Sequence, residues 1–220
     1  MQIDRRRFLG VALVTGVAAC TGRMSAPPPQ VAAPVPPPAP PVQSAVAAAP
    51  VMEPPPLIKQ ALAALERNVV AARDRMAVVD FSLHSSLPRL HLVDVASGKI
   101  EQSLLVAHGS GSDPDHSGNV RLFSNTPGSN ASSEGAYLTA ERYVGQHGAS
   151  QRLIGLDPTN NQAYSRAIVV HGADYVAPSL IRQQGRIGRS QGCFALEQHE
   201  VLSFMDRLGQ GRLIYAAKLV

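Results

Sequence analysis

Hydrophobic residues recur at intervals of three and four positions over residues 57–75, a pattern that predicts an amphipathic helix. The apolar stripe consists of Ile58, Leu62, Leu65, Val69 and Ala72. A second helix is predicted over residues 197–208, and Gly209 supplies the residue type that commonly ends helices.

Between these helices the pattern favours strands, because short segments rich in β-branched and apolar residues are separated by turn residues. The predicted strands are residues 76–83, 89–95, 100–108, 136–143, 167–171 and 212–217. Residues 96–99 have turn chemistry and join two strands as a hairpin. A loop rich in Gly, Ser, Asn, Asp and Pro spans 108–135, and loops this long are usually functional or disordered. The sequence therefore predicts a mainly β domain with a few helices.

Composition separates the first quarter of the 220-residue chain from the rest, since 13 of its 18 prolines fall between Pro27 and Pro56. Proline lacks an amide proton and fixes its own backbone, so residues 21–56 are expected to form an extended Pro/Ala-rich tether. The alternative is that part of this segment folds back over the domain and restricts its cleft. Residues 57–220 are sufficient for one core.

The N-terminus has the features of an export signal. Three arginines, Arg5 to Arg7, precede an apolar run over residues 10–19 that is too short to span a membrane as a mature helix. Residues 1–20 are therefore predicted to be a signal peptide resembling the twin-arginine type. Residues 17–20 also resemble a lipoprotein cleavage box, with Cys20 as the lipidated residue and membrane tether. Ordinary cleavage nearby is the alternative. Either route predicts an exported, periplasmic protein.

The formal net charge of +4 gives little support for nucleic-acid binding. Arg5 to Arg7, offset by Asp4, supply half of this charge, and the rest of the chain has no basic stripe with interleaved aromatic residues. We therefore expect no nucleic-acid partner.

Two residues are candidates for nucleophilic chemistry. His171 ends a buried apolar strand, and Cys193, the only cysteine after the signal region, follows a glycine-rich turn. A cysteine near a helix start with an imidazole in reach is expected to have a lowered thiol pKa and to attack carbonyl groups. The alternative is a buried structural cysteine and a histidine bonded to backbone.

A zinc site would draw on Cys193, His171, His108 and His147, but these residues lack metal-type spacing, so no metal is expected. The carboxylates Asp113, Asp115 and Asp174 lie in turn-like contexts, where they usually bond nearby backbone.

The sequence around these two residues resembles the L,D-transpeptidase catalytic domain family of bacterial cell-wall enzymes. The segments that carry the resemblance are VDFS (79–82), LVAHG (105–109), FSNTPGS (123–129), SSEGAY (132–137), SRAI (165–168), VVHGADY (169–175) and GRSQGC (188–193). The resemblance covers residues 76–215, so we assign residues 76–220 to the catalytic domain. It implies an L,D-transpeptidase-type β-sandwich or barrel with peripheral helices and a long loop near the active site.

The resemblance also implies residue roles, with no cofactor. Cys193 would be the nucleophile, His171 the general base, and Ser190 the residue that orients His171 through its carbonyl or hydroxyl group. The amides of Gly192 and Cys193 would form the oxyanion hole. Gln191 stands where the family has His or Trp, which is expected to alter the wall beside the thiolate.

Four residues are expected substrate contacts: Arg189, Gln191, Tyr137 and His108. For three of them a structural role is the alternative, namely a solvated Arg189, a core Tyr137 and a loop His108.

The implied reaction is peptidoglycan cross-linking. Cys193 would form a thioester with a stem peptide and transfer it to an amine of a second stem or of an outer-membrane lipoprotein, making 3,3 or 1,3 links. Carbapenem acylation of Cys193 is implied too. The alternatives are an L,D-carboxypeptidase or endopeptidase that gives the thioester to water, and a non-catalytic peptidoglycan-binding module.

Overall fold

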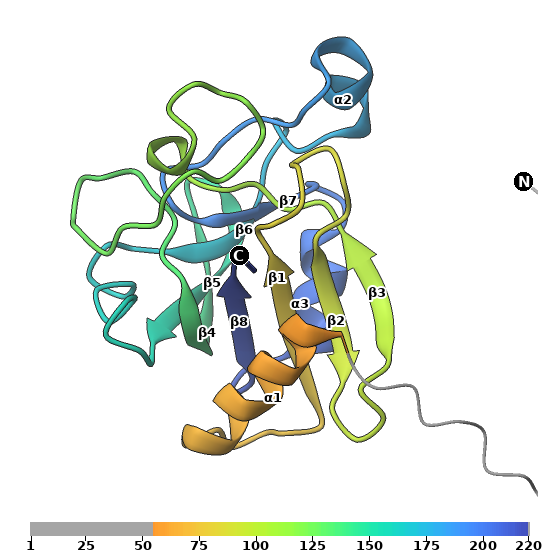
Figure 1. Cartoon of the computed structure of the whole chain (residues 1–220), viewed down its shortest axis with the longest axis vertical. Helices are drawn as coiled ribbons and strands as arrows, with labels where there is room; N and C mark the ends of the chain where they lie inside the picture. The colour runs from red at the N-terminus through yellow and green to blue at the C-terminus, as the bar shows by residue number, and fades with distance from the viewer. Residues whose placement is uncertain (1–54, 220) are drawn as a thin grey trace, which may run out of the picture. The chain divides into compact units, whose positions relative to one another are not determined.

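The structure is a computed structural model that describes residues 55–219, and its central feature is one mixed sheet of eight strands (Figure 1). The strands are β1 (Arg75–Asp80), β2 (Leu90–Asp94), β3 (Ile100–Leu104), β4 (Gly135–Gly145), β5 (Gly148–Gly155), β6 (Val169–Gly172), β7 (Phe194–Leu196) and β8 (Leu213–Ala217). Their order is β3-β2-β1-β8-β4-β5-β6-β7. The β1–β8 and β6–β7 pairs are parallel and the other neighbours are antiparallel. The predicted mainly β class is confirmed.

Helices cover both faces of this sheet. Successive strand side chains point to opposite faces, and β1 is buried on both. Met76 and Val78 belong to the cluster that packs beneath α1 (Pro56–Arg67). Ala77 and Val79 belong to the cluster that contains the apolar residues of α3 (Val201–Leu208). In Figure 1, α1 lies in front of the sheet and α3 behind it.

The first helix differs from its predicted span of 57–75. It begins at Pro56, which the sequence assigned to the tether, because proline is well accommodated in the first turn of a helix. It ends at Arg67, where Asn68 turns extended (φ −110°, ψ 149°) and donates its side-chain amide to the Ala64 carbonyl at 2.8 Å. Val69, predicted to lie on the apolar stripe, is 97% exposed.

Three elements were not predicted from the pattern: β5, β7 and α2 (Pro178–Gln184). β7 is only three residues long. β5 buries the polar side chain of Gln151, whose amide donates to the carbonyls of Ala140 at 3.2 Å and Gly209 at 3.3 Å. Gln151 can therefore be buried because its amide is hydrogen-bonded, which a hydropathy pattern does not reveal.

The long loop between β3 and β4 lies beside the last strand of the sheet and contains a 3₁₀ turn, Ser110–Ser112. The Ala107 amide donates to the Ala195 carbonyl at 2.9 Å, and the Ser190 amide donates to the His108 carbonyl at 2.9 Å. The loop thus lies along the segment that carries Cys193, as expected.

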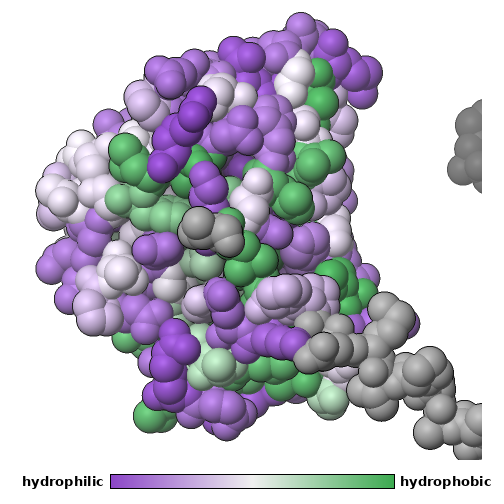
Figure 2. Space-filling model, viewed as in Figure 1, coloured by the Kyte–Doolittle hydropathy of each residue, from purple (hydrophilic) through white to green (hydrophobic). Residues whose placement is uncertain are grey.

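The predicted signal peptide (1–20), Cys20 and the tether up to residue 54 lie outside the described residues. Within residues 55–219, no helix is both long and apolar enough to cross a membrane. On the face shown in Figure 2, hydrophilic residues predominate and hydrophobic residues show as separate patches.

Candidate active site

Cys193 and His171 line the same pocket, which has a volume of about 840 Å³. The parallel pairing of β6 with β7 sets His171 opposite Ala195, so the two candidate residues come from adjacent strand ends. Cys193 immediately precedes the strand β7, and α3 begins only at Val201. The expectation that Cys193 lies near a helix start is therefore wrong.

The imidazole of His171 is 2% exposed and is fixed by one backbone contact. Its Nδ1 lies 2.9 Å from the Gly172 carbonyl oxygen, which can only accept, so Nδ1 carries the proton and Nε2 is left as the base. Burial lowers the pKa of His171, the Gly172 contact opposes this shift, and the charge of His147 adds to it. These effects keep the ring neutral and able to accept a proton at neutral pH.

Ser190 has a different role from the one the resemblance implied. Its hydroxyl donates to the Cys193 carbonyl at 2.7 Å and accepts the Gly192 amide at 3.1 Å. Its carbonyl accepts the Ser110 amide at 2.8 Å. In the structure, Gly172 rather than Ser190 orients the base, and Ser190 fixes the turn that carries the nucleophile.

The same contacts alter the expected oxyanion hole. Because the Gly192 amide donates to Ser190 Oγ, it does not point freely at a substrate in this arrangement. Gly192 has φ +112°, a conformation that L side chains rarely adopt. The Cys193 amide remains the candidate donor of the two.

Cys193 is partly exposed, and its thiol donates to the Ala167 carbonyl at 3.6 Å. Ala167 itself has φ +53°, which is uncommon for a non-glycine residue and places strain beside the nucleophile. Burial raises the pKa of Cys193 above its usual value, whereas the Val169 backbone amide and the Arg166 charge act to lower it. The expectation of a lowered thiol pKa is therefore wrong, since desolvation outweighs the two stabilising groups.

Arg166 is a functional candidate that sequence reasoning did not single out, although it lies within the quoted SRAI segment. It lines the pocket and donates to the carbonyls of Ser124 at 2.8 Å and Ala131 at 2.5 Å. It therefore holds the long loop and places a positive charge near the thiol.

We expect Arg166→Gln to slow alkylation of Cys193 by iodoacetamide at pH 8 by about three- to tenfold, because losing a nearby cation raises the thiol pKa. Site-resolved mass spectrometry across pH measures the rate. Arg166→Lys keeps the charge and should recover most of the rate. An equal loss in both variants would show instead that loop packing, not charge, is what Arg166 supplies.

Two predicted substrate contacts are buried in the core. Tyr137 is 0% exposed, and its hydroxyl donates to the Ser133 carbonyl at 2.7 Å while its ring packs edge-on against Phe194. His108 is also 0% exposed. Neither side chain lines the pocket. Tyr137 on β4 and His108 on the loop between β3 and β4 both point into the core. Arg189 and Gln191 do line the pocket.

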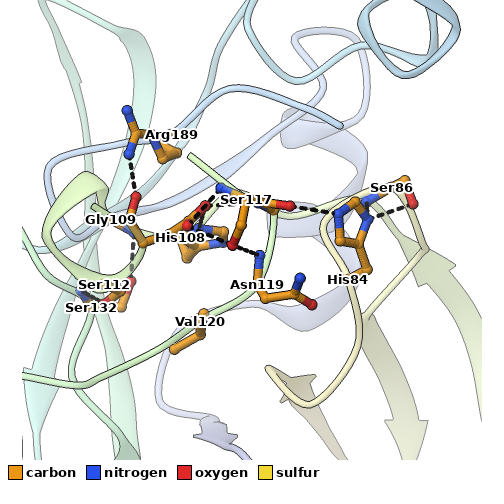
Figure 3. A network of polar contacts seen from close by, with 12 residues as sticks. His84, Ser86, His108, Gly109, Ser112, Ser117, Asn119, Val120, Ser132 and Arg189 are labelled. Atoms are coloured by element: carbon orange, nitrogen blue, oxygen red, sulfur yellow. Dashed lines mark hydrogen bonds and ion pairs between the residues drawn. The ribbon is translucent and has the colours of Figure 1, made fainter. Parts of the chain in front are cut away.

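His108 belongs to a buried ionic network with Arg89 and Asp113, part of which Figure 3 shows. Arg89 Nη2 lies 2.6 Å from His108 Nδ1, and His108 Nε2 lies 3.3 Å from the Asp113 carboxylate. Arg189 donates to the Asp113 carbonyl, which joins the network to the pocket wall. The network therefore supports the loop side of the site.

The charges of the network are strongly perturbed. Burial, then the Arg89 charge, lowers the pKa of His108 to about 4. Burial acts to raise the pKa of Asp113, but the Ser117 and Gly118 amides, the Ser117 hydroxyl and His108 outweigh it and hold that pKa at about 2. His108 is thus neutral in the folded protein at neutral pH.

This neutral His108 predicts acid sensitivity. Between pH 6.5 and about 4 the unfolded His108 binds a proton that the folded one excludes, so the free energy of unfolding falls as pH falls through this window. The loss for His108 is on the order of 2–3 kcal/mol. Urea unfolding at pH 7.5 and 4.5 measures it, and His108→Gln should reduce the pH dependence, whereas exposed His199→Gln should not. Equal slopes in wild type and His108→Gln would contradict the assignment.

The four residues considered for a zinc site are Cys193, His171, His108 and His147. In the part of the chain that the structure describes, no group of three or more His, Cys, Asp or Glu residues is arranged to hold a metal ion. His147 and His171 do meet, but as stacked rings with centroids 4.5 Å apart.

Comparison with known proteins identifies the family. A profile described as the L,D-transpeptidase catalytic domain matches residues 54–217, and no curated protein matches. Similar solved structures include an L,D-transpeptidase from Mycobacterium smegmatis, with 13% identity, a TM-score of 0.40 and coverage of 66% of this chain and 58% of that one. Another, residues 123–326 of the L,D-transpeptidase from Xylanimonas cellulosilytica, has 14% identity, a TM-score of 0.39 and coverage of 72% and 69%.

This chain spans less than two thirds of the length of the mycobacterial structures that it matches. The family profile, in contrast, covers well over half of this chain, including α1 and every strand. The chain belongs to the L,D-transpeptidase catalytic domain family.

Proposed function

We propose that the protein is a peptidoglycan L,D-transpeptidase that uses Cys193 as nucleophile and His171 as base. The observation that carries the proposal is that a free thiol and an imidazole with its Nδ1 proton committed to Gly172 line one pocket. Peptidoglycan stem peptides bear carboxylates, and the cations Arg166 and Arg189 in the pocket wall suit such a substrate.

In the first half-reaction, His171 Nε2 takes the proton of the Cys193 thiol and the thiolate attacks a carbonyl carbon on the C-terminal side of an L-centre. We propose that the Cys193 amide donates to the developing oxyanion. The amide C–N bond then breaks, and the imidazolium gives its proton to the leaving amine. Val169 N–H and Arg166 favour the thiolate during this step. The product is a Cys193 thioester.

In the second half-reaction, an amine of a second stem or of a lipoprotein attacks the thioester. His171 accepts the amine proton, and the C–S bond breaks to regenerate the thiol after the proton returns. A donor carbonyl at diaminopimelate gives a 3,3 link, and one at L-alanine gives a 1,3 link. We propose that this occurs in the periplasm, in line with the predicted signal peptide and the predicted lipid anchor at Cys20.

The test is product analysis by mass spectrometry after the full chain is incubated with defined tripeptide, tetrapeptide and pentapeptide muropeptides. Wild type should form a dimer whose fragmentation locates the new bond, and Cys193→Ala should form none. His199→Ala, at an exposed residue that is not part of the pocket lining, is the matched control and should retain activity. Shortened stems without dimers, dependent on Cys193, would indicate an L,D-carboxypeptidase or endopeptidase. No product at all would favour a binding module.

A further inference from the structure

The β4–β5 hairpin extends beyond the rest of the sheet and ends beside the candidate base. β4 pairs with β8 only over Gly135 to Leu138, whereas its pairing with β5 continues to Gly145 and Gly148. Only Gln146 and His147 lie between that last pair, so they form the tip of the hairpin. On the inner side, β5 pairs with β6 and sets Ser150 opposite His171.

Side-chain contacts anchor this extended hairpin. The guanidinium of Arg152 lies 4.7 Å from the ring centroid of Tyr143 and 5.4 Å from that of Tyr164. Glu141 completes the cluster, since its carboxylate lies 3.1 Å from Arg152 Nε and accepts the Tyr164 hydroxyl at 3.2 Å. These contacts tie the hairpin to the segment before Arg166, so the tip has a defined position.

The tip places the ring of His147 against the ring of His171. Their centroids are 4.5 Å apart and their planes differ by 25°, which is a stacked arrangement. Gln146 Nε2 lies 3.1 Å from His147 Nε2, a contact in which the amide donates to a neutral imidazole. His147 is exposed on its other side and lines the pocket that contains Cys193.

We propose that His147 is a positioning residue for the base: it holds the plane of the His171 ring so that Nε2 stays directed at the nucleophile's side of the pocket. The inference rests on the proposed function, in which His171 must accept the Cys193 proton. The Gly172 contact fixes one edge of the His171 ring, but the ring can still rotate about that hydrogen bond. Stacking restricts this remaining rotation.

The other groups near the base do not duplicate this contact. The titratable and charged side chains that line the pocket with His171 are Tyr143, His147, Arg166, Tyr175, Arg189 and Cys193. Among the described residues, only His147 has a recorded ring contact with His171.

The experiment is the rate of Cys193 alkylation by iodoacetamide at pH 6.5 and at pH 10, followed in the full chain by site-resolved mass spectrometry. Three variants are compared with wild type: His147→Ala, His147→Phe and the control His199→Ala. At pH 6.5 the thiolate depends on proton transfer to His171, whereas at pH 10 hydroxide removes the proton without it. This readout requires no peptidoglycan substrate.

We expect His147→Ala to slow alkylation about three- to tenfold at pH 6.5 and less than twofold at pH 10, the size expected for one lost ring stack. His147→Phe, which keeps a flat ring, should recover most of the loss, and His199→Ala should match wild type. Equal slowing at both pH values, or no slowing in His147→Ala, would overturn the proposal. So would failure of the phenylalanine variant to recover the rate.

The outcome is separable from that of the proposed function. A pH-selective loss in a protein that forms no muropeptide dimer would retain the positioning role and reject transpeptidation. Dimer formation by wild type, together with an unaltered alkylation profile in His147→Ala, would support transpeptidation and reject the positioning role of His147.

Discussion

Replacing Arg89 with leucine is expected to lower the free energy of unfolding by on the order of 3–5 kcal/mol, the cost typical of breaking a buried ionic network. The Arg89 side chain is 0% exposed, and its guanidinium donates to the Val106 carbonyl at 3.1 and 3.0 Å and to the Leu83 carbonyl at 2.9 Å. Leucine would leave the two carbonyl acceptors without their donor and would remove the positive charge that interacts with the Asp113 carboxylate. Thermal unfolding should shift down by about 10 °C.

The loss should not be recovered by Arg89→Lys. An ammonium group is a point charge on a flexible stem and cannot reproduce the fork that reaches two carbonyls and His108 together. Burial already lowers the pKa of Arg89 to about 9 despite the charges of Asp113 and Asp80, and a buried lysine is more readily neutralised.

Urea unfolding followed by circular dichroism measures both variants at pH 7.5. Arg182→Leu, on an exposed position of α2, is the matched control and should change stability by less than about 0.5 kcal/mol. A loss below about 1 kcal/mol for Arg89→Leu would contradict the view that this network supports the domain.

The local pattern made Cys193 and His171 candidates, and the family resemblance made them the predicted nucleophile and base. A buried apolar strand delivers His171, and a glycine-rich turn precedes an isolated cysteine. In the structure, His171 and Cys193 line one pocket. Their roles as catalytic groups remain predictions until the variants are assayed.

The errors concern side chains whose surroundings come from distant segments. Tyr137 and His108 lie next to family-like motifs, yet strand alternation and loop packing turn both into the core. Arg89 begins the predicted strand 89–95, but the sequence assigned it no role, because its partners Val106 and His108 come from a later segment. The periodicity of a short segment gives no information about partners that come from another segment.

The role assigned to Ser190 shows a related limit. The family resemblance implied that Ser190 orients the base, but its hydroxyl closes a turn with Gly192 and Cys193 instead. The group that orients His171 is the carbonyl of its own neighbour, Gly172. A backbone acceptor has no side-chain signature, so residue identity alone could not reveal it.

That turn also carries the second large expected effect, because Gly192→Ala should reduce Cys193-dependent activity by about 100-fold or more. Gly192 has φ +112°, where an alanine costs on the order of 1–3 kcal/mol in backbone strain. Its added Cβ would lie 2.8 Å from the Ala131 carbonyl oxygen and 2.8 Å from Ile168 Cδ1. Arg166 holds that same carbonyl, so it cannot move away without breaking the contact.

The clash is therefore expected to be relieved by a shift of the 190–193 turn itself. Displacement of a nucleophile by about 1 Å can cost on the order of 100-fold in rate. Muropeptide turnover and the rate of Cys193 alkylation measure the effect, and urea unfolding shows how much of the strain is borne by the whole domain.

Gly185→Ala is the matched control, since Gly185 also has positive φ (+78°) but a Cβ there meets nothing within 4 Å. This variant should lose about 1 kcal/mol of stability and should retain full activity. Comparison of the two variants separates strain from steric displacement of the nucleophile. Activity of Gly192→Ala within fivefold of wild type would mean that the turn can shift without moving Cys193.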